Sequence, residues 1–188
     1  MIPAATRPAT VPPGEPDAQQ RRHVVSALVV DRPGTLNRVS GLLRARSFNI
    51  ESLTVGTTHE PGRSRMTIAL HGDDGHLRQV LAQLERLIEV LEVTDLTSTE
   101  RIELELALVE LDAPATDEAT QQLNDILTTA GGEVLQTDAR AWRARLAAPP
   151  SRIDDAIEAL RGRGLRSLVR AGAVAIAAPS TQNGASDA

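Results

Sequence analysis

Hydrophobic and polar positions in the first half of the chain follow two periods, one typical of strands and one typical of helices. The segment His23–Val30 is a nearly continuous apolar, β-branched run, which predicts a central strand buried on both faces. The predicted elements, in order, are a strand at His23–Val30, a helix from Leu36 to about Ser47, strands at Ile50–Thr58 and Ser64–Leu70 joined by a hairpin at His59–Gly62, a helix capped by Asp73 or Asp74, and a strand at Val90–Thr97.

The second half of the chain repeats this order. In its first strand, aliphatic residues alternate with Glu103 and Glu105, whose carboxylates we expect to be solvated. The predicted elements are a strand at Arg101–Leu111, a helix capped by Thr116 and ended by Gly131-Gly132, strands at Glu133–Thr137 and Ala141–Ala147, a helix capped by Ser151, and a final strand or strand pair at Leu165–Ala177.

The repeated order predicts an α+β protein with two ferredoxin-like βαββαβ domains in tandem, at residues 22–98 and 100–178. Residues 1–21 are rich in Pro, Ala and Thr and show no periodicity, so we expect a disordered leader there. Residues 179–188 are expected to be a disordered tail.

The composition excludes several classes of function. The 188 residues include one Phe and one Trp, so base-stacking nucleic-acid surfaces are close to excluded. There is no lysine, which rules out a Schiff-base amine and a P-loop, and no cysteine, which rules out thiolate chemistry. No apolar run approaches the roughly 20 residues that span a bilayer. We therefore expect a cytoplasmic protein that binds neither nucleic acid nor membrane.

The loop Asp31–Leu36 is the strongest candidate binding site in the sequence. It joins a buried strand directly to a helix, and the first amides of a helix lack partners within the helix and carry partial positive charge. Pro33 fixes the loop, Gly34 removes a side chain that would block approach, and Asp31 adds an acidic group. A carboxylate at Gly34, Thr35 and Leu36, with an ammonium near Asp31, is the pattern that an α-amino acid needs. On local sequence the same residues are also compatible with a simple turn.

Four further segments extend this motif into a family resemblance. They are Phe48–Gly56 (FNIESLTVG), Ser64–Ile68 (SRMTI) and, more loosely, Glu103–Leu111 with Leu165–Ile176. The first half resembles an ACT domain, a ligand-sensing module of amino-acid metabolism. The whole chain resembles the small regulatory subunit of acetolactate synthase, also called acetohydroxyacid synthase, whose second domain is ACT-like.

The resemblance implies a non-catalytic chain without its own cofactor or metal. It implies a homodimer that binds a branched-chain amino acid, valine above all, between two chains. The large catalytic subunit would carry thiamine diphosphate, Mg²⁺ and FAD, and this chain would raise its activity and confer feedback inhibition. The implied effector-binding residues are Asp31, Arg32, Pro33, Gly34, Thr35 and Leu36 of one chain, and Asn49 with Ile50 and Gly56 of the other.

Other interpretations fit the same sequence. An ACT sensor for a different enzyme and another amino acid fits the same residues. RNA-binding modules share the βαββαβ order, but they place aromatic and basic residues on the sheet. The cluster His71–His76 holds two His and two Asp that could ligate a metal, although helix capping explains it equally. No nucleophile elbow or zinc-protease motif indicates an enzyme.

Overall fold

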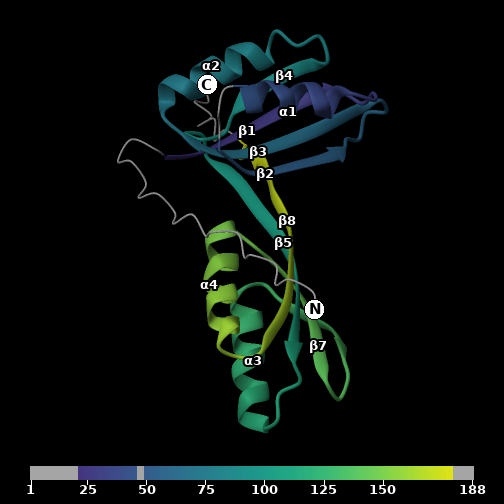
Figure 1. The fold of residues 1–188 in the computed structure, drawn as a ribbon, viewed down its shortest axis with the longest axis vertical. Helices are drawn as coiled ribbons and strands as arrows, with labels where there is room; N and C mark the ends of the chain where they lie inside the picture. The colour runs from purple at the N-terminus through teal and green to yellow at the C-terminus, as the bar shows by residue number, and fades with distance from the viewer. Residues whose placement is uncertain (1–20, 46–48, 180–188) are drawn as a thin grey trace, which may run out of the picture.

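The computed structural model describes residues 21–45 and 49–179 (Figure 1). Its elements are β1 (Arg21–Val30), α1 (Thr35–Ala45), β2 (Asn49–Thr57), β3 (Arg63–Gly72), α2 (Asp74–Leu84), β4 (Val90–Asp95), β5 (Arg101–Asp112), α3 (Asp117–Thr129), β6 (Glu133–Thr137), β7 (Ala141–Ala148), α4 (Pro150–Arg161) and β8 (Leu165–Ala177). This is the predicted βαββαβ order, found twice. The expected leader and tail lie outside the described part except for their inner ends, Arg21, which belongs to β1, and Pro179. The predicted helix end near Ser47 falls on residues 46–48, which also lie outside it.

The first sheet has the strand order β2-β3-β1-β4, and all its pairs are antiparallel. One face of this sheet packs against α1 and α2 through aliphatic side chains of both layers. Figure 1 shows both helices on the side of the sheet that faces away from the rest of the molecule. The opposite face of the sheet is therefore directed toward the second half of the chain. β1 is a central strand, as its continuous apolar pattern predicts.

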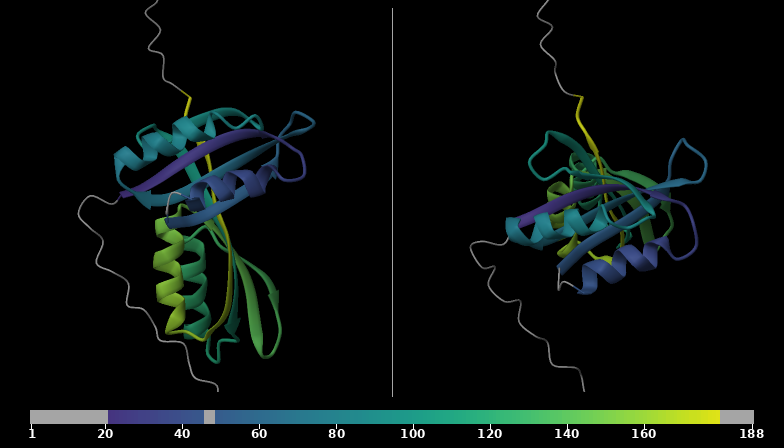
Figure 2. Two further views of the ribbon diagram at one scale, coloured as in Figure 1. Left: turned by 45° about the horizontal axis from the view of Figure 1, so that its top comes forward. Right: turned by 90° about the horizontal axis from the view of Figure 1, so that it is seen from above.

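The second sheet has the order β6-β7-β5-β8 and is covered on one face by α3 and α4. β5 and β8 are its longest strands, with 12 and 13 residues. Only Glu105–Asp112 of β5 pairs with β7, whereas residues Arg101 to Leu111 of β5 pair with β8. The remaining segments, Arg101–Leu104 of β5 and their partners at the end of β8, form a two-stranded ribbon that reaches the first sheet, as Figure 1 and the left view of Figure 2 show.

Helix starts follow the predicted capping chemistry at two of three positions. The carboxylate of Asp73 accepts from the amide of His76, and the Thr116 hydroxyl accepts from the amide of Ala119. The predicted cap at Ser151 is wrong, because α4 begins one residue earlier, at Pro150, with Pro149 at the N-cap and no side-chain cap. Proline is well suited to the first helical turn because it has no N–H group to satisfy.

The polarity of β5 is the reverse of the expected one. The side chain of Glu105 is buried, at 5% exposed, and that of Glu103 is largely covered, at 10% exposed, so the expectation that they are solvated is wrong. The aliphatic residues of the other face are exposed instead. We call this surface the apolar face; its members are each between 42% and 65% exposed and are Ile102, Leu104, Leu106, Leu108, Val169, Val174 and Ile176. Strand alternation predicts two faces but cannot tell which of them is covered.

No helix in residues 21–45 and 49–179 is long and apolar enough to cross a membrane.

Candidate functional site

The loop between β1 and α1 is held in place by hydrogen bonds to its own residues, to the end of β1 and to the β2–β3 hairpin. Thr35 is only 4% exposed, and its hydroxyl donates to the carbonyl of Val30 at 3.0 Å. Its amide donates to the carbonyl of Arg32 at 3.2 Å. The amide of Asp31 donates to Gly62 in the β2–β3 hairpin at 2.9 Å. Thr35 is therefore occupied in fixing the loop, and the residues on either side of it face solvent.

Three amides of this loop are available to a ligand. Those of Gly34, Leu36 and Asn37 make no hydrogen bond to any described residue. Gly34 has a φ of 93°, a left-handed conformation that favours glycine, and a Cβ built there would meet nothing within 4 Å. Free amides in the first turn of an 11-residue helix attract an anion. Asn37 was not among the predicted site residues, because its side chain gave no signal and only its backbone contributes.

The side chains of the loop residues are exposed to solvent, and the Asp31 carboxylate has no partner that would neutralise its charge. Asp31, Arg32, Pro33 and Gly34 are all exposed, and the Asp31 carboxylate makes no ion pair or hydrogen bond within the described residues. It is therefore free to accept from an ammonium group. Leu36 is 47% exposed and offers apolar surface beside the free amides. The loop thus presents hydrogen-bond donors for an anion, a carboxylate and an apolar side chain within one turn.

The predicted second wall of the site is split between the two ends of β2. Gly56 is exposed and lies at the same end of the sheet as the loop, since it pairs with Arg65, two residues from Arg63, the partner of Val30. Asn49 is also exposed but pairs with His71 at the opposite end. Eight residue steps along a strand span about 26 Å. Within one chain, Asn49 therefore cannot contact a ligand bound at Gly34.

Ile50 lies beside Asn49, and its side chain packs against the core under α1 and α2. It is half-buried, so it supports the start of β2 and leaves only part of its surface to a ligand. The structure thus brings together six predicted loop residues and Gly56, and separates them from Asn49 and Ile50. A site that uses both groups needs two chains.

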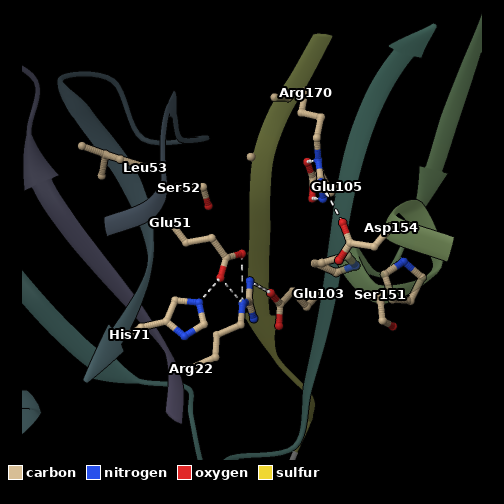
Figure 3. Close-up of a pocket in the computed structure, with 14 residues that line it drawn as sticks. Arg22, Glu51, Ser52, Leu53, His71, Glu103, Glu105, Ser151, Asp154 and Arg170 are labelled. Atoms are coloured by element: carbon tan, nitrogen blue, oxygen red, sulfur yellow. Dashed lines mark hydrogen bonds and ion pairs between the residues drawn. The ribbon is translucent and has the colours of Figure 1, made fainter. Parts of the chain in front are cut away.

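Apart from the loop, a hollow of about 890 Å³ lies between the two domains (Figure 3). Its charged side chains are already paired with one another. Arg22 contacts both Glu51 and Glu103, and Arg170 contacts both Glu105 and Asp154. Because these charges satisfy each other, the hollow is better described as a contact between domains than as an open ligand site.

The cluster His71–His76 is explained by capping and pairing. Hydrogen bonds from the amide and the ring of His76 to Asp73, despite some desolvation, lower the pKa of the Asp73 carboxyl. His71 contacts Glu51 across the sheet at 3.0 Å. No group of three or more potential metal ligands occurs within the part of the chain that the structure describes.

Comparison with known families agrees with both halves of the fold. Residues 25–92 match the family described as the AHAS small subunit-like ACT domain. Residues 104–179 match the family described as the small subunit of acetolactate synthase. The two matches together cover both sheets.

Individual relatives show similarity along almost the same length. A probable acetolactate synthase small subunit of Methanothermobacter thermautotrophicus is 38% identical over 164 residues, which is 86% of this chain and 94% of the relative. An acetolactate synthase small subunit of Aquifex aeolicus is 36% identical over 84% of this chain and 82% of its own. The crystal structure of the acetolactate synthase small subunit from Thermotoga maritima matches with a TM-score of 0.74 and 31% identity, covering 84% of this chain and 98% of that one.

Proposed function

Because this chain belongs to the family of acetolactate synthase small subunits, we propose that it binds the catalytic large subunit, raises its activity and makes it sensitive to valine. The family places the chain in branched-chain amino-acid biosynthesis, as a regulatory subunit. The observation that carries the finer proposal is the set of three free amides at Gly34, Leu36 and Asn37 together with the unpaired Asp31.

The geometry of the loop suits an α-amino acid in two respects. The ligand carboxylate accepts from the amides of Gly34 and Leu36, which also lie at the positive end of α1. The ligand ammonium donates to the Asp31 carboxylate. Charge-assisted hydrogen bonds contribute about 1.5–3 kcal/mol each, so a few of them support micromolar to millimolar affinity. Such affinity suits a sensor of the pathway's own end product.

A second copy of the chain completes the site through β2. This strand is an edge of its sheet, and Glu51 is its only charged residue, so little protects it from pairing with another strand. Antiparallel pairing of two β2 strands about a two-fold axis centred near Leu53 would place Asn49 of one copy beside Thr57 of the other. That end of the strand holds the loop of the second copy. The separation of Asn49 from Gly34 within one chain is then removed.

The chemistry of acetolactate formation belongs to the partner in this proposal. The large subunit would hold thiamine diphosphate, Mg²⁺ and FAD, and this chain would supply no cofactor ligand. Its contribution is a coupling between valine binding and the partner's activity, which typically amounts to about 1–3 kcal/mol.

Reconstitution with the catalytic subunit encoded in the same genome tests the proposal. We expect the chain to form no acetolactate by itself, to raise the rate of the catalytic subunit, and to make that rate fall when valine is added. A rate that is unchanged by the chain would contradict the assigned partner. A thermal-shift screen of the amino acids separates the effector from the partner, because a ligand stabilises the protein in proportion to the logarithm of its concentration. Stabilisation by an unrelated amino acid and not by valine would instead indicate a sensor for another enzyme.

A further inference from the structure

β8 crosses the open face of the first sheet with an irregular segment. Glu105 pairs with Ala173 and Ala107 with Arg170, so β8 contains one residue more than β5 between these pairs. This is a β-bulge, and Gly172 within it has a φ of 80°. The bulge bends β8 where the ribbon leaves the second sheet and meets β2.

At the bulge, β8 contacts two side chains of β2 directly. The Thr54 hydroxyl donates to the carbonyl of Ala171 at 3.2 Å, and the amide of Ala173 donates to the Ser52 hydroxyl at 3.4 Å. A Cβ added to Gly172 would come within 3.0 Å of both Ser52 and Thr54. The two strands are therefore in contact without a gap. We call this group the β2–β8 joint; it consists of Ser52, Thr54, Ala171, Gly172 and Ala173.

Ion pairs and a small apolar cluster flank the joint and hold the ribbon against the sheet. Arg22 on β1 contacts Glu103 of the ribbon at 2.7 Å and Glu51 of β2 at 2.8 Å (Figure 3). Burial would lower the pKa of Arg22, but its hydrogen bonds to these two carboxylates outweigh burial and raise it. Beyond the joint, Ala175 packs against Val24 and Leu96 of the first domain.

On its other side, the joint is connected to the helical layer of the second domain. Arg170, one residue before Ala171, holds the buried Glu105 with two hydrogen bonds and contacts Asp154 of α4 at 2.7 Å. The hydrogen bond to Glu105 raises the pKa of the Arg170 guanidinium, so this connection stays charged. Thus β2 and α4 are linked through a single short stretch of β8.

We propose that the β2–β8 joint transmits the state of the effector strand β2 to the second domain. Ser52 and Thr54 lie between Asn49 and Gly56, the two ends of the predicted effector wall, and their side chains make hydrogen bonds to the bulge of β8. A shift or ordering of β2 on ligand binding must displace the bulge, because Gly172 leaves no free space beside them. Interfaces packed in this way change between discrete arrangements. The effector part of this inference rests on the function proposed above.

The mechanical coupling is testable without any ligand. Trp142 is the only tryptophan and packs against the core of the second domain, so its fluorescence reports that domain, whereas far-UV circular dichroism reports both. When the wild-type chain is unfolded in urea, we expect the fluorescence curve and the circular dichroism curve to coincide. Gly172→Ala should separate their midpoints by roughly 0.5 M or more. Gly62→Ala is the matched control, since Gly62 has a φ of 78° and nothing within 4 Å of its Cβ position.

A second pair of variants, with smaller changes, tests the joint if Gly172→Ala does not fold. Thr54→Val keeps the shape and removes the hydrogen bond to Ala171, and Thr57→Val makes the same change three residues along β2. Separated curves for Thr54→Val and coincident ones for Thr57→Val support the joint. Two results would overturn the proposed joint: unfolding curves that are separate in the wild type, or curves that coincide in both Gly172→Ala and Thr54→Val.

A second experiment repeats the urea curves with valine present. It distinguishes a failure of the β2–β8 joint from a failure of the proposed effector. Valine should raise the Trp142 midpoint of the wild type. In Thr54→Val it should bind with an affinity within about twofold in calorimetry, yet no longer move that midpoint. An equal movement in wild type and variant would contradict transmission through the joint. If calorimetry shows no valine binding to the wild type, the proposed effector fails, and the urea curves alone decide whether the joint couples the domains.

Discussion

Two properties of Gly34 keep the loop accessible to an anion. Its backbone is left-handed, with a φ of 93°, and the space beside it is open. The amides of Gly34, Leu36 and Asn37 are free of partners among the described residues, whereas the buried hydroxyl of Thr35 anchors the turn to the end of β1. A residue with no side chain is thus placed where an anion can approach the helix amides closely.

The change Gly34→Asp tests this description of the loop. The new carboxylate would occupy the space of the ligand carboxylate and repel it, so we expect valine affinity to fall by at least about 100-fold, the loss of two charge-assisted hydrogen bonds. Calorimetry measures the affinity directly. Gly162→Asp introduces the same charge at an equally open position in the second domain, away from the loop, and should leave binding nearly unchanged. Equal affinity in wild type and Gly34→Asp would refute the site.

Glu103 provides a test of the charged contact between domains. Burial would raise its pKa, but hydrogen bonds from Arg22 and Arg101 outweigh burial and lower the pKa below its ordinary value of 4.5. A carboxyl whose pKa is lowered by folding stabilises the folded state above its ordinary pKa, and this contribution disappears as the pH falls through the folded pKa. We therefore expect Glu103→Gln to reduce the free energy of unfolding by about 1–3 kcal/mol at neutral pH.

The difference between wild type and Glu103→Gln should shrink as the pH falls below 4.5, because the wild-type carboxyl then becomes neutral as well. Urea denaturation at a series of pH values measures it. Glu133→Gln is the control: this side chain is 59% exposed and pairs with Arg145, so its removal should cost no more than about 0.5 kcal/mol. A difference for Glu103→Gln that does not change with pH would contradict the assigned ion pair.

At the scale of elements, the apolar face is the largest feature that a single chain leaves unexplained. It runs along β5 and β8 on the side of the second sheet opposite to α3 and α4. Seven exposed aliphatic side chains on one face are unusual for a monomer, since extended apolar patches usually mark an interface. A two-fold dimer brings the same face of two copies together, which suits an apolar surface that is complementary to itself.

Leu104→Arg tests whether the apolar face is covered by a second copy. The change places two like charges in one apolar contact, so we expect the dimer dissociation constant to rise at least about tenfold. Sedimentation equilibrium measures this constant, and circular dichroism verifies the fold. Ile88→Arg introduces the same charge at a side chain that is 85% exposed in the α2–β4 turn, away from this face, and should have no effect. An unchanged constant for Leu104→Arg would show that the apolar face has another role.

The order of elements was predictable because each has a local signal. Period, capping residues and glycine turns predicted all eight strands and four helices in the described residues, with ends displaced by only a few residues. The misplaced cap at Ser151 arose because Pro150 can start a helix without any side-chain cap. Local signals carry no information on which face of a strand is covered, and for that reason the burial of Glu103 and Glu105 was not predicted.

At the scale of the whole molecule, the loop Asp31–Leu36 could be predicted, whereas its relation to the rest of the chain could not. The sequence contains no sign that β8 lies over β2, because Ser52 and Gly172 are 120 positions apart and each is unremarkable in its own segment. The distance between Asn49 and Gly34 follows only from strand register. Both features result from how two sheets are placed, which depends on contacts distant in sequence.

The central claim is that each effector site is made of a loop from one chain and Asn49 from another. Mixing two defective variants tests it most directly. Gly34→Asp and Asn49→Ala should each fail to bind valine, but in a mixed dimer one of the two sites has both an intact loop and an intact Asn49. After equal mixing and exchange of subunits, calorimetry should therefore recover valine binding at about a quarter of the sites. Normal valine binding by Asn49→Ala, or no recovery in a mixture that forms mixed dimers, would contradict the shared site.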